Sequence, residues 1–202
     1  MKLYYSPGAC SMAPHIMLHE LGKKFTIEKV DLGVHKTETG KDFTKINQKA
    51  YVPTLEIGKG EVLTEVSTIL QYLADKSKAT KYLPKAGTMA RYRAMETLNF
   101  IASELHKGIG GLFNPAMPDA GKDSIKGRVA KRLAYVNGIL GKQKFIAGKT
   151  FSVADAYAFT VINWCNLVGI DLSGYKNIGP YMATIAKRPA VQATLKAEGL
   201  LK

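Results

Sequence analysis

The sequence predicts a chain in two parts, an α/β domain followed by an all-α domain. In the first 76 residues, short apolar or alternating runs typical of strands are interspersed with apolar positions at helical spacing. Residues 77–87 are polar, contain Pro84 and Gly87, and predict a linker. From residue 88 onward only helical spacing occurs. We therefore predict domains over residues 1–76 and 88–202.

The first strand and the first helix meet at a cysteine. Leu3 to Tyr5 is predicted as a strand, Ser6 to Gly8 as a turn, and Gly22 marks the end of the helix that follows. Cys10 therefore lies at a helix start, where amide N–H groups and the positive end of the helix dipole favour a thiolate. The alternative is a structural cysteine, since cysteines that form no disulfide are often buried.

Five further segments complete the predicted α/β domain. The predicted strands are Phe25 to Leu32, Tyr51 to Ile57 and Glu61 to Thr64, and the predicted helices are Lys41 to Asn47 and Glu65 to Asp75. Gly58-Lys59-Gly60 joins the last two strands as a hairpin. Because strand-helix-strand connections are right-handed, the first two strands are predicted to be parallel neighbours in a mixed four-stranded sheet.

The second part is predicted to contain a buried core helix with a capping box. The expected helices span residues 89–110, 123–140, 153–168, 177–187 and 190–198. Ser152 is the expected N-cap of the third helix, and Asp155 is expected to reach back to it. Because this helix is apolar nearly all round, we expect it to be buried, with Cys165 in the core.

Composition limits the possible functions. Two cysteines without a CxxC pair or a His/Cys cluster predict a reducing cytoplasm and no structural metal. No apolar run is long enough to span a bilayer, and the first residues lack the apolar region of a signal peptide. Of the net charge of +13, residues 81–202 carry +11. The basic run from Lys122 to Arg132 has no interleaved aromatic residues, which favours a solvated helix face over a nucleic-acid site.

Seven short motifs are distributed along the chain: Pro7-Gly8-Ala9-Cys10-Ser11, Val52-Pro53, Thr64-Glu65, Gln71 to Asp75, Leu98 to Gly108, Val153 to Tyr157 and Ala197 to Leu201. In combination they resemble the bacterial beta class of glutathione transferases. The motifs extend nearly from end to end, and their specificity lies in the combination. The resemblance implies a thioredoxin-like N-terminal domain, an all-α C-terminal domain and a homodimer. It also implies glutathione as co-substrate, small electrophiles as second substrates and no metal.

The resemblance implies how the first domain would bind glutathione. A cis peptide before Pro53 would present the backbone of Val52 for strand addition, although a trans peptide is the more common form without the resemblance. Glu65 would bind the substrate ammonium, and the N–H groups of Val66 and Ser67 at the helix start would bind the γ-glutamyl carboxylate. The alternative for Glu65 is a carboxylate that only stabilises the helix N-terminus.

Two positions depart from the family pattern. The family often has a lysine where this chain has His35, and that lysine would bind the glycyl carboxylate of glutathione. This role therefore falls either to His35 or to the neighbouring Lys36. Val66 replaces the usual Gly or Ser, which preserves a backbone contact and removes a hydroxyl.

The second domain is expected to supply the remaining site residues. Asn99, Ser103 and His106 are spaced by four and three residues, so an α-helix would place them on one face. By resemblance, Asn99, Ser103 and Glu104 contribute to the glutathione site across the dimer, and Leu105 belongs to the same set. His106 would face the reactive cysteine and the second substrate. A solvated polar stripe and a structural histidine are the alternatives.

These features predict a cytoplasmic glutathione transferase with Cys10 and His106 as catalytic residues. As a thiolate, Cys10 would form a mixed disulfide or stabilise the glutathione thiolate for conjugation. One alternative is a thiol-disulfide reductase of the glutaredoxin or omega type. The other is a transferase-fold binding module without enzymatic activity. The presence of both Cys10 and Glu65 argues against the module, and the basic C-terminal half leaves it open.

Overall fold

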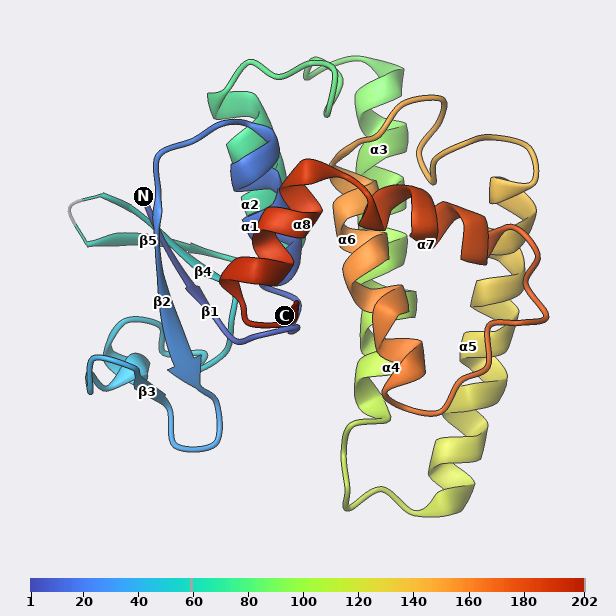
Figure 1. Ribbon diagram of the computed structural model, residues 1–202, viewed down its shortest axis with the longest axis horizontal. Helices are drawn as coiled ribbons and strands as arrows, with labels where there is room; N and C mark the ends of the chain where they lie inside the picture. Colours follow the sequence, from blue (N-terminus) through green and yellow to red (C-terminus); the bar gives the residue numbers. More distant parts are fainter. Residues whose placement is uncertain (59, 202) are drawn as a thin grey trace. The chain divides into compact units, whose positions relative to one another are not determined.

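The computed structural model describes residues 1–58 and 60–201, and the chain divides into two compact units (Figure 1). The first unit combines residues 1–79 with the segment from Arg188 to the C-terminus, and the second contains residues 80–187. The predicted domain limits therefore need correction at the C-terminal end, because the last helix belongs to the first unit. Tyr82 and Leu83, predicted as linker, are buried in the second unit.

A mixed five-stranded sheet forms the frame of the first unit. Its spatial order is β3 (Lys36–Thr37), β2 (Thr26–Asp31), β1 (Lys2–Tyr5), β4 (Thr54–Gly58) and β5 (Glu61–Thr64). As predicted, β1 and β2 are parallel, and β4 pairs antiparallel with β5. The edge strand β3 was not predicted, because two residues are too few to show an alternating pattern. Lys59, in the predicted hairpin turn, lies outside the described residues.

Three helices lie together to one side of this sheet (Figure 1). They are α1 (Met12–Glu20), α2 (Val66–Lys76) and α8 (Pro189–Ala197), and α1 contacts both of the others. Arg188 binds α8 to α1 through a bidentate ion pair with Glu20, at 2.6 and 2.9 Å. The predicted helix from Lys41 to Asn47 is a short 3₁₀ turn at Phe43–Lys45.

The second unit is helical. Its elements are α3 (Met89–Phe100), a π-helical segment (Ile101–His106), α4 (Lys107–Gly111), α5 (Asp119–Leu140), α6 (Val153–Asn163), a 3₁₀ turn (Trp164–Asn166) and α7 (Ile178–Ala186). Residues 153–162 of α6 are all buried, which confirms the predicted core helix. Cys165 is also buried, as predicted, but it lies in the 3₁₀ turn rather than in the α-helix.

The carboxylate of Asp155 joins three segments of the second unit. It accepts hydrogen bonds from the backbone N–H and the hydroxyl of Ser152, at 2.8 and 2.7 Å, which confirms the capping box. It also accepts from Ile146 N at 2.8 Å and from the Tyr181 hydroxyl at 3.1 Å. Burial raises the pKa of Asp155 even though these hydrogen bonds act in the opposite direction.

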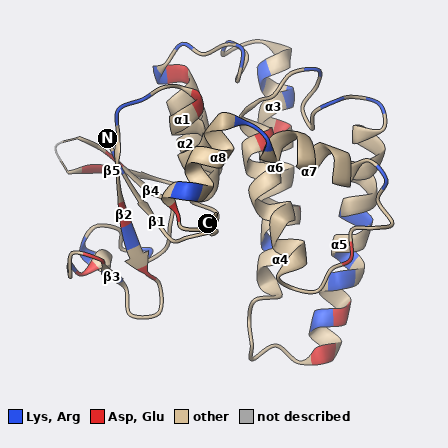
Figure 2. Cartoon of the chain, in the orientation of Figure 1, with Lys and Arg blue, Asp and Glu red and all other residues tan. Residues whose placement is uncertain are grey.

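Basic residues are spread along α5, as Figure 2 shows, and Lys126, Arg128 and Lys131 are exposed. This exposure agrees with the predicted solvated helix face. Among the described residues, no helix combines the length and the apolar character needed to cross a membrane.

Candidate functional site

Cys10 lies in the turn between β1 and α1 and is half-buried. Its thiol is 3.2 Å from the carbonyl oxygen of Val52 and donates a hydrogen bond to it. Cys10 also lies directly before the start of α1, where backbone N–H groups and the positive end of the helix dipole converge. The other cysteine, Cys165, is fully buried, and burial raises its pKa to about 12. Of the two, Cys10 is the sulfur with access to a substrate.

The loop that carries the cysteine is held by the C-terminal segment. Gly8 N donates to Glu198 Oε2 at 2.8 Å, and His15 Nδ1 lies 2.8 Å from Glu198 Oε1. The Glu198 carboxylate is completely buried. Within the loop, the hydroxyl of Ser11 bonds both the N–H and the carbonyl of Ser6, each at 3.2 Å. The loop that carries Cys10 is therefore held both by the C-terminal segment and by its own hydrogen bonds.

The peptide between Val52 and Pro53 is cis, as the resemblance implied. The loop before it is organised by the buried Asn47, whose side-chain amide donates to Tyr51 O at 2.8 Å and to Thr54 Oγ1 at 3.0 Å. The geometry therefore brings the backbone of Val52 to the cysteine.

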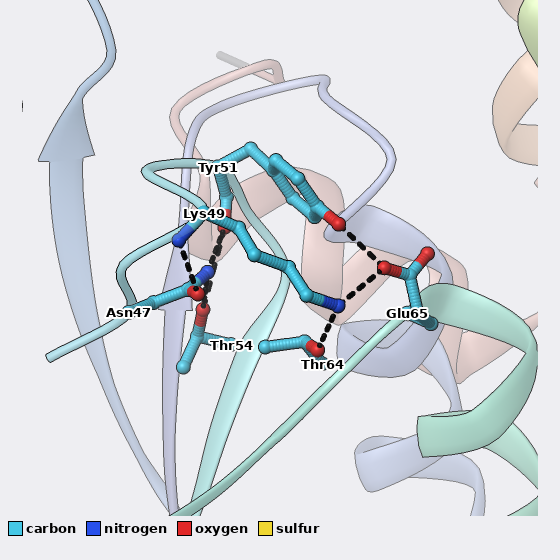
Figure 3. Close-up of polar contacts among 6 residues, drawn as sticks. All are labelled: Asn47, Lys49, Tyr51, Thr54, Thr64 and Glu65. Carbon is cyan, nitrogen blue, oxygen red and sulfur yellow. Dashed lines mark hydrogen bonds and ion pairs between the residues drawn. The ribbon is translucent and has the colours of Figure 1, made fainter. Parts of the chain in front are cut away.

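Glu65 precedes α2 and has a left-handed backbone, with φ of 69°. Such a conformation costs a non-glycine residue about 1–3 kcal/mol and is found mainly at functional sites. The Glu65 carboxylate accepts from Lys49 Nζ at 2.9 Å and from the Tyr51 hydroxyl (Figure 3). Lys49 Nζ also donates to Thr64 Oγ1 at 3.0 Å. The Val66 side chain is buried, so only its backbone can contact a ligand.

Sequence reasoning missed Lys49 and Tyr51 as neighbours of Glu65. Lys49 and Tyr51 precede Glu65 by 16 and 14 residues. No helical or strand periodicity connects positions so far apart. Lys49 lies between a predicted helix and a predicted strand, and Tyr51 is the first residue of that predicted strand, so neither position was marked as part of a site.

The two candidates for the glycyl carboxylate differ in their surroundings. His35 has a left-handed backbone, with φ of 52°, and its carbonyl accepts from Phe43 N at 2.8 Å. Its ring Nδ1 is buried and has no hydrogen-bond partner among the described residues. Lys36 lies on the edge strand β3 and is exposed. Both residues therefore remain candidates: His35 is half-buried in an ordered loop, and the Lys36 ammonium is open to solvent.

The prediction that Asn99, Ser103 and His106 share one face of an α-helix is wrong in detail. Asn99 lies in α3, but Ser103 and His106 belong to the π-helical segment, whose wider turns change which residues share a face. Such segments often occur at functional sites. The spacing of the buried Leu98, Ile101 and Leu105 fits an α-helix equally well, so the sequence did not reveal the π turns.

The side chains of this segment have defined surroundings within the second unit. The Ser103 hydroxyl donates to Asn99 O at 2.9 Å, and Glu104 accepts from Arg132 Nε. His106 Nδ1 lies 2.6 Å from the Tyr157 hydroxyl. This bond holds the imidazole in one orientation, and the tautomer of the ring determines which of the two atoms donates.

The Leu105 side chain is fully buried, so its expected role in binding glutathione is limited to its backbone.

Among the described residues, no group of three or more His, Cys, Asp or Glu side chains is arranged to hold a metal ion.

Comparison with known proteins places the chain among glutathione S-transferases. Residues 8–76 match the profile of the glutathione S-transferase N-terminal domain, and residues 100–189 match that of the C-terminal domain. Glutathione S-transferase GstA from Escherichia coli O157:H7 is 44% identical over 200 residues, covering 99% of this chain and 100% of that protein.

Solved structures give the same result. A sphingomonad glutathione S-transferase complexed with glutathione is 46% identical, with a TM-score of 0.95 and full coverage of both chains. A beta-class enzyme from Sphingomonas chungbukensis is also 46% identical, with a TM-score of 0.96 and full coverage of both chains.

The position of Glu198 leads to a test of how the loop is held. Glu198→Ala would leave the Gly8 N–H and a buried His15 nitrogen without their acceptor. We expect the free energy of unfolding to fall by about 3 kcal/mol. The rate of Cys10 alkylation by iodoacetamide should also change, because the loop loses its anchor. Urea denaturation and mass spectrometry measure the two effects.

Glu61→Ala, which removes an exposed carboxylate from β5, is the matched control and should alter stability by less than about 0.5 kcal/mol. If Glu198→Ala matched this control in both measurements, the C-terminal segment would not hold the loop.

Proposed function

Because the chain belongs to the glutathione S-transferase family, we propose that it is a beta-class enzyme of the cysteine type. It would conjugate glutathione to small electrophiles, exchange thiols and disulfides with glutathione, or do both. The observation that carries the proposal is the half-buried Cys10 at the start of α1, 3.2 Å from the Val52 carbonyl. The beta-class relative with full coverage supports the same class.

Cysteine suits disulfide exchange better than conjugation. In exchange, the Cys10 thiolate attacks one sulfur of a glutathione-containing disulfide, forms a mixed disulfide and releases the other sulfur as a thiolate. A second thiolate, that of glutathione, then attacks the mixed disulfide and restores Cys10. In conjugation, Cys10 would only stabilise the glutathione thiolate while that thiolate attacks the electrophile.

The first unit would hold glutathione through four contacts. The backbone of Val52 would pair with the cysteinyl part, and Glu65 would bind the α-ammonium. The N–H groups of Val66 and Ser67 at the start of α2 would bind the γ-glutamyl carboxylate. Either His35 or the exposed Lys36 would bind the glycyl carboxylate.

The second unit would contribute polar groups from α3 and the π-helical segment. We propose that Asn99, Ser103 and Glu104, with the backbone of Leu105, complete the glutathione site of a partner subunit. His106 would act at the second substrate as a proton donor or acceptor. The Tyr157 hydroxyl supports this role because it orients the ring.

We propose that the enzyme is a homodimer. A groove of about 630 Å³ in the second unit contains Phe100 and Tyr135, whose rings pack edge to face at 5.3 Å. It also contains two ion pairs, Arg93–Glu96 and Arg132–Glu104. A surface that carries both signs of charge beside exposed aromatic area can pair with a copy of itself about a two-fold axis.

We place the enzyme in the reducing cytoplasm. Neither Cys10 nor Cys165 forms a disulfide, and the chemistry proposed for Cys10 requires a reduced sulfur.

Replacing each cysteine in turn tests the proposed nucleophile. Cys10→Ala should abolish the mixed disulfide that forms with oxidised glutathione, detected as a mass increase of the intact protein. Cys165→Ala, the matched control, should form it normally, because burial holds the Cys165 thiol protonated at neutral pH. An adduct that persists in Cys10→Ala and disappears in Cys165→Ala would show that Cys165, and not Cys10, is the nucleophile.

Removing the histidine tests the second catalytic residue. His106→Ala should lower turnover at saturating glutathione at least about tenfold, since general acid–base catalysis contributes roughly 10²–10⁴-fold. Glutathione affinity should change little, because the groups expected to bind its ammonium, its two carboxylates and its cysteinyl part lie in the first unit. Steady-state kinetics with both substrates varied separates the two parameters. Lys107→Ala, at an exposed neighbouring position, is the control. Weaker affinity with unchanged turnover would make His106 a binding residue.

Sedimentation equilibrium tests the homodimer. The protein should sediment at twice the 22.0 kDa of one chain. Tyr135→Asp, which places a charge in the groove, should shift it toward the monomer. Tyr92→Asp, at an exposed tyrosine of α3 outside the groove, should remain dimeric. A dimer that tolerates Tyr135→Asp would show that another surface forms the contact.

A further inference from the structure

The carboxylate expected to bind glutathione is already in contact with an internal cation. Lys49 Nζ donates to Glu65 Oε1 at 2.9 Å and to Thr64 Oγ1 at 3.0 Å (Figure 3). An ammonium thus lies between a carboxylate and a hydroxyl. The α-ammonium of glutathione has the same charge and the same hydrogen-bond donors as the lysine ammonium. Both groups therefore suit the same acceptors.

We propose that Lys49 is an internal competitor for the ammonium-binding carboxylate of Glu65, and that glutathione displaces it on binding. This inference rests on the proposed function, since it assumes that Glu65 binds the α-ammonium. It adds a residue that sets the affinity for glutathione without contacting the reacting sulfur.

Hydrogen bonds within the loop from Asn47 to Tyr51 hold the backbone of Lys49 in place. Asn47 accepts from Lys49 N at 3.0 Å and donates to Tyr51 O at 2.8 Å, which fixes the backbone on both sides of Ala50. The Tyr51 hydroxyl donates to the same oxygen of Glu65 as the lysine does. Two donors from one ordered loop therefore converge on Glu65.

The ion pair is weak enough to be displaced. The side chains of Lys49 and Glu65 are 50% and 55% exposed, so water screens their attraction. The hydrogen bond with Glu65 raises the pKa of Lys49, which keeps it charged under all ordinary conditions. Exposed pairs of this kind alter an equilibrium by at most about fivefold. Displacement by glutathione therefore reduces its affinity without preventing binding.

A pair of ligands separates competition from general electrostatic attraction. S-methylglutathione carries the α-ammonium and cannot form a disulfide with the protein. The matching analogue with a glutaryl group in place of γ-glutamyl lacks only the ammonium. Isothermal titration calorimetry measures the affinity of both for the wild-type chain, for Lys49→Met and for Lys45→Met. Lys45 is an exposed lysine of the same unit, so its replacement removes the same charge.

Lys49→Met should bind S-methylglutathione about two- to fivefold more tightly, because the competitor is gone. It should bind the des-amino analogue no more tightly than the wild type does, and Lys45→Met should strengthen neither ligand. Equal changes for both ligands in Lys49→Met, or weaker binding of S-methylglutathione, would overturn the inference while leaving the proposed function intact. If S-methylglutathione bound none of the three proteins, the proposed function and the inference would both be wrong.

Discussion

A buried carboxylate near the C-terminus organises the first unit of this protein. Glu198 accepts a hydrogen bond from Gly8 in the loop that carries Cys10 and contacts His15 in α1. A carboxylate removed from water is stable only where such partners compensate for its lost hydration. The last helix, the first helix and the loop before it must therefore form together. The position of Cys10 depends on this arrangement, because Gly8 lies two residues before it.

The second unit also contains a buried carboxylate that joins several segments. Asp155 is buried and receives hydrogen bonds from the start of its own helix, from Ile146 and from Tyr181. In each unit one acidic side chain thus joins segments that are distant in sequence. Such networks specify a unique arrangement because every donor left without its acceptor would cost about 1–3 kcal/mol.

The part of the first unit that we propose to bind glutathione has a different character. Its polar groups are partly exposed, and its backbone adopts left-handed conformations at His35 and Glu65. Both residues are candidates for binding charged groups of glutathione. Backbone strain costs stability and exposed ion pairs add little to it, but both fix the directions in which the groups point.

The sequence alone determined what depends on neighbouring residues: the strand-turn-helix around Cys10, the capping box at Ser152 and the core helix that follows it. Periodicity and capping chemistry act over a few residues, so a linear pattern reports them. It did not reveal that the final helix packs with the first unit, that π turns interrupt the helix before His106, or that Lys49 reaches Glu65. Those features arise from contacts between distant segments and from packing against buried surfaces. Only the tertiary structure decides which of the many possible partners each side chain meets.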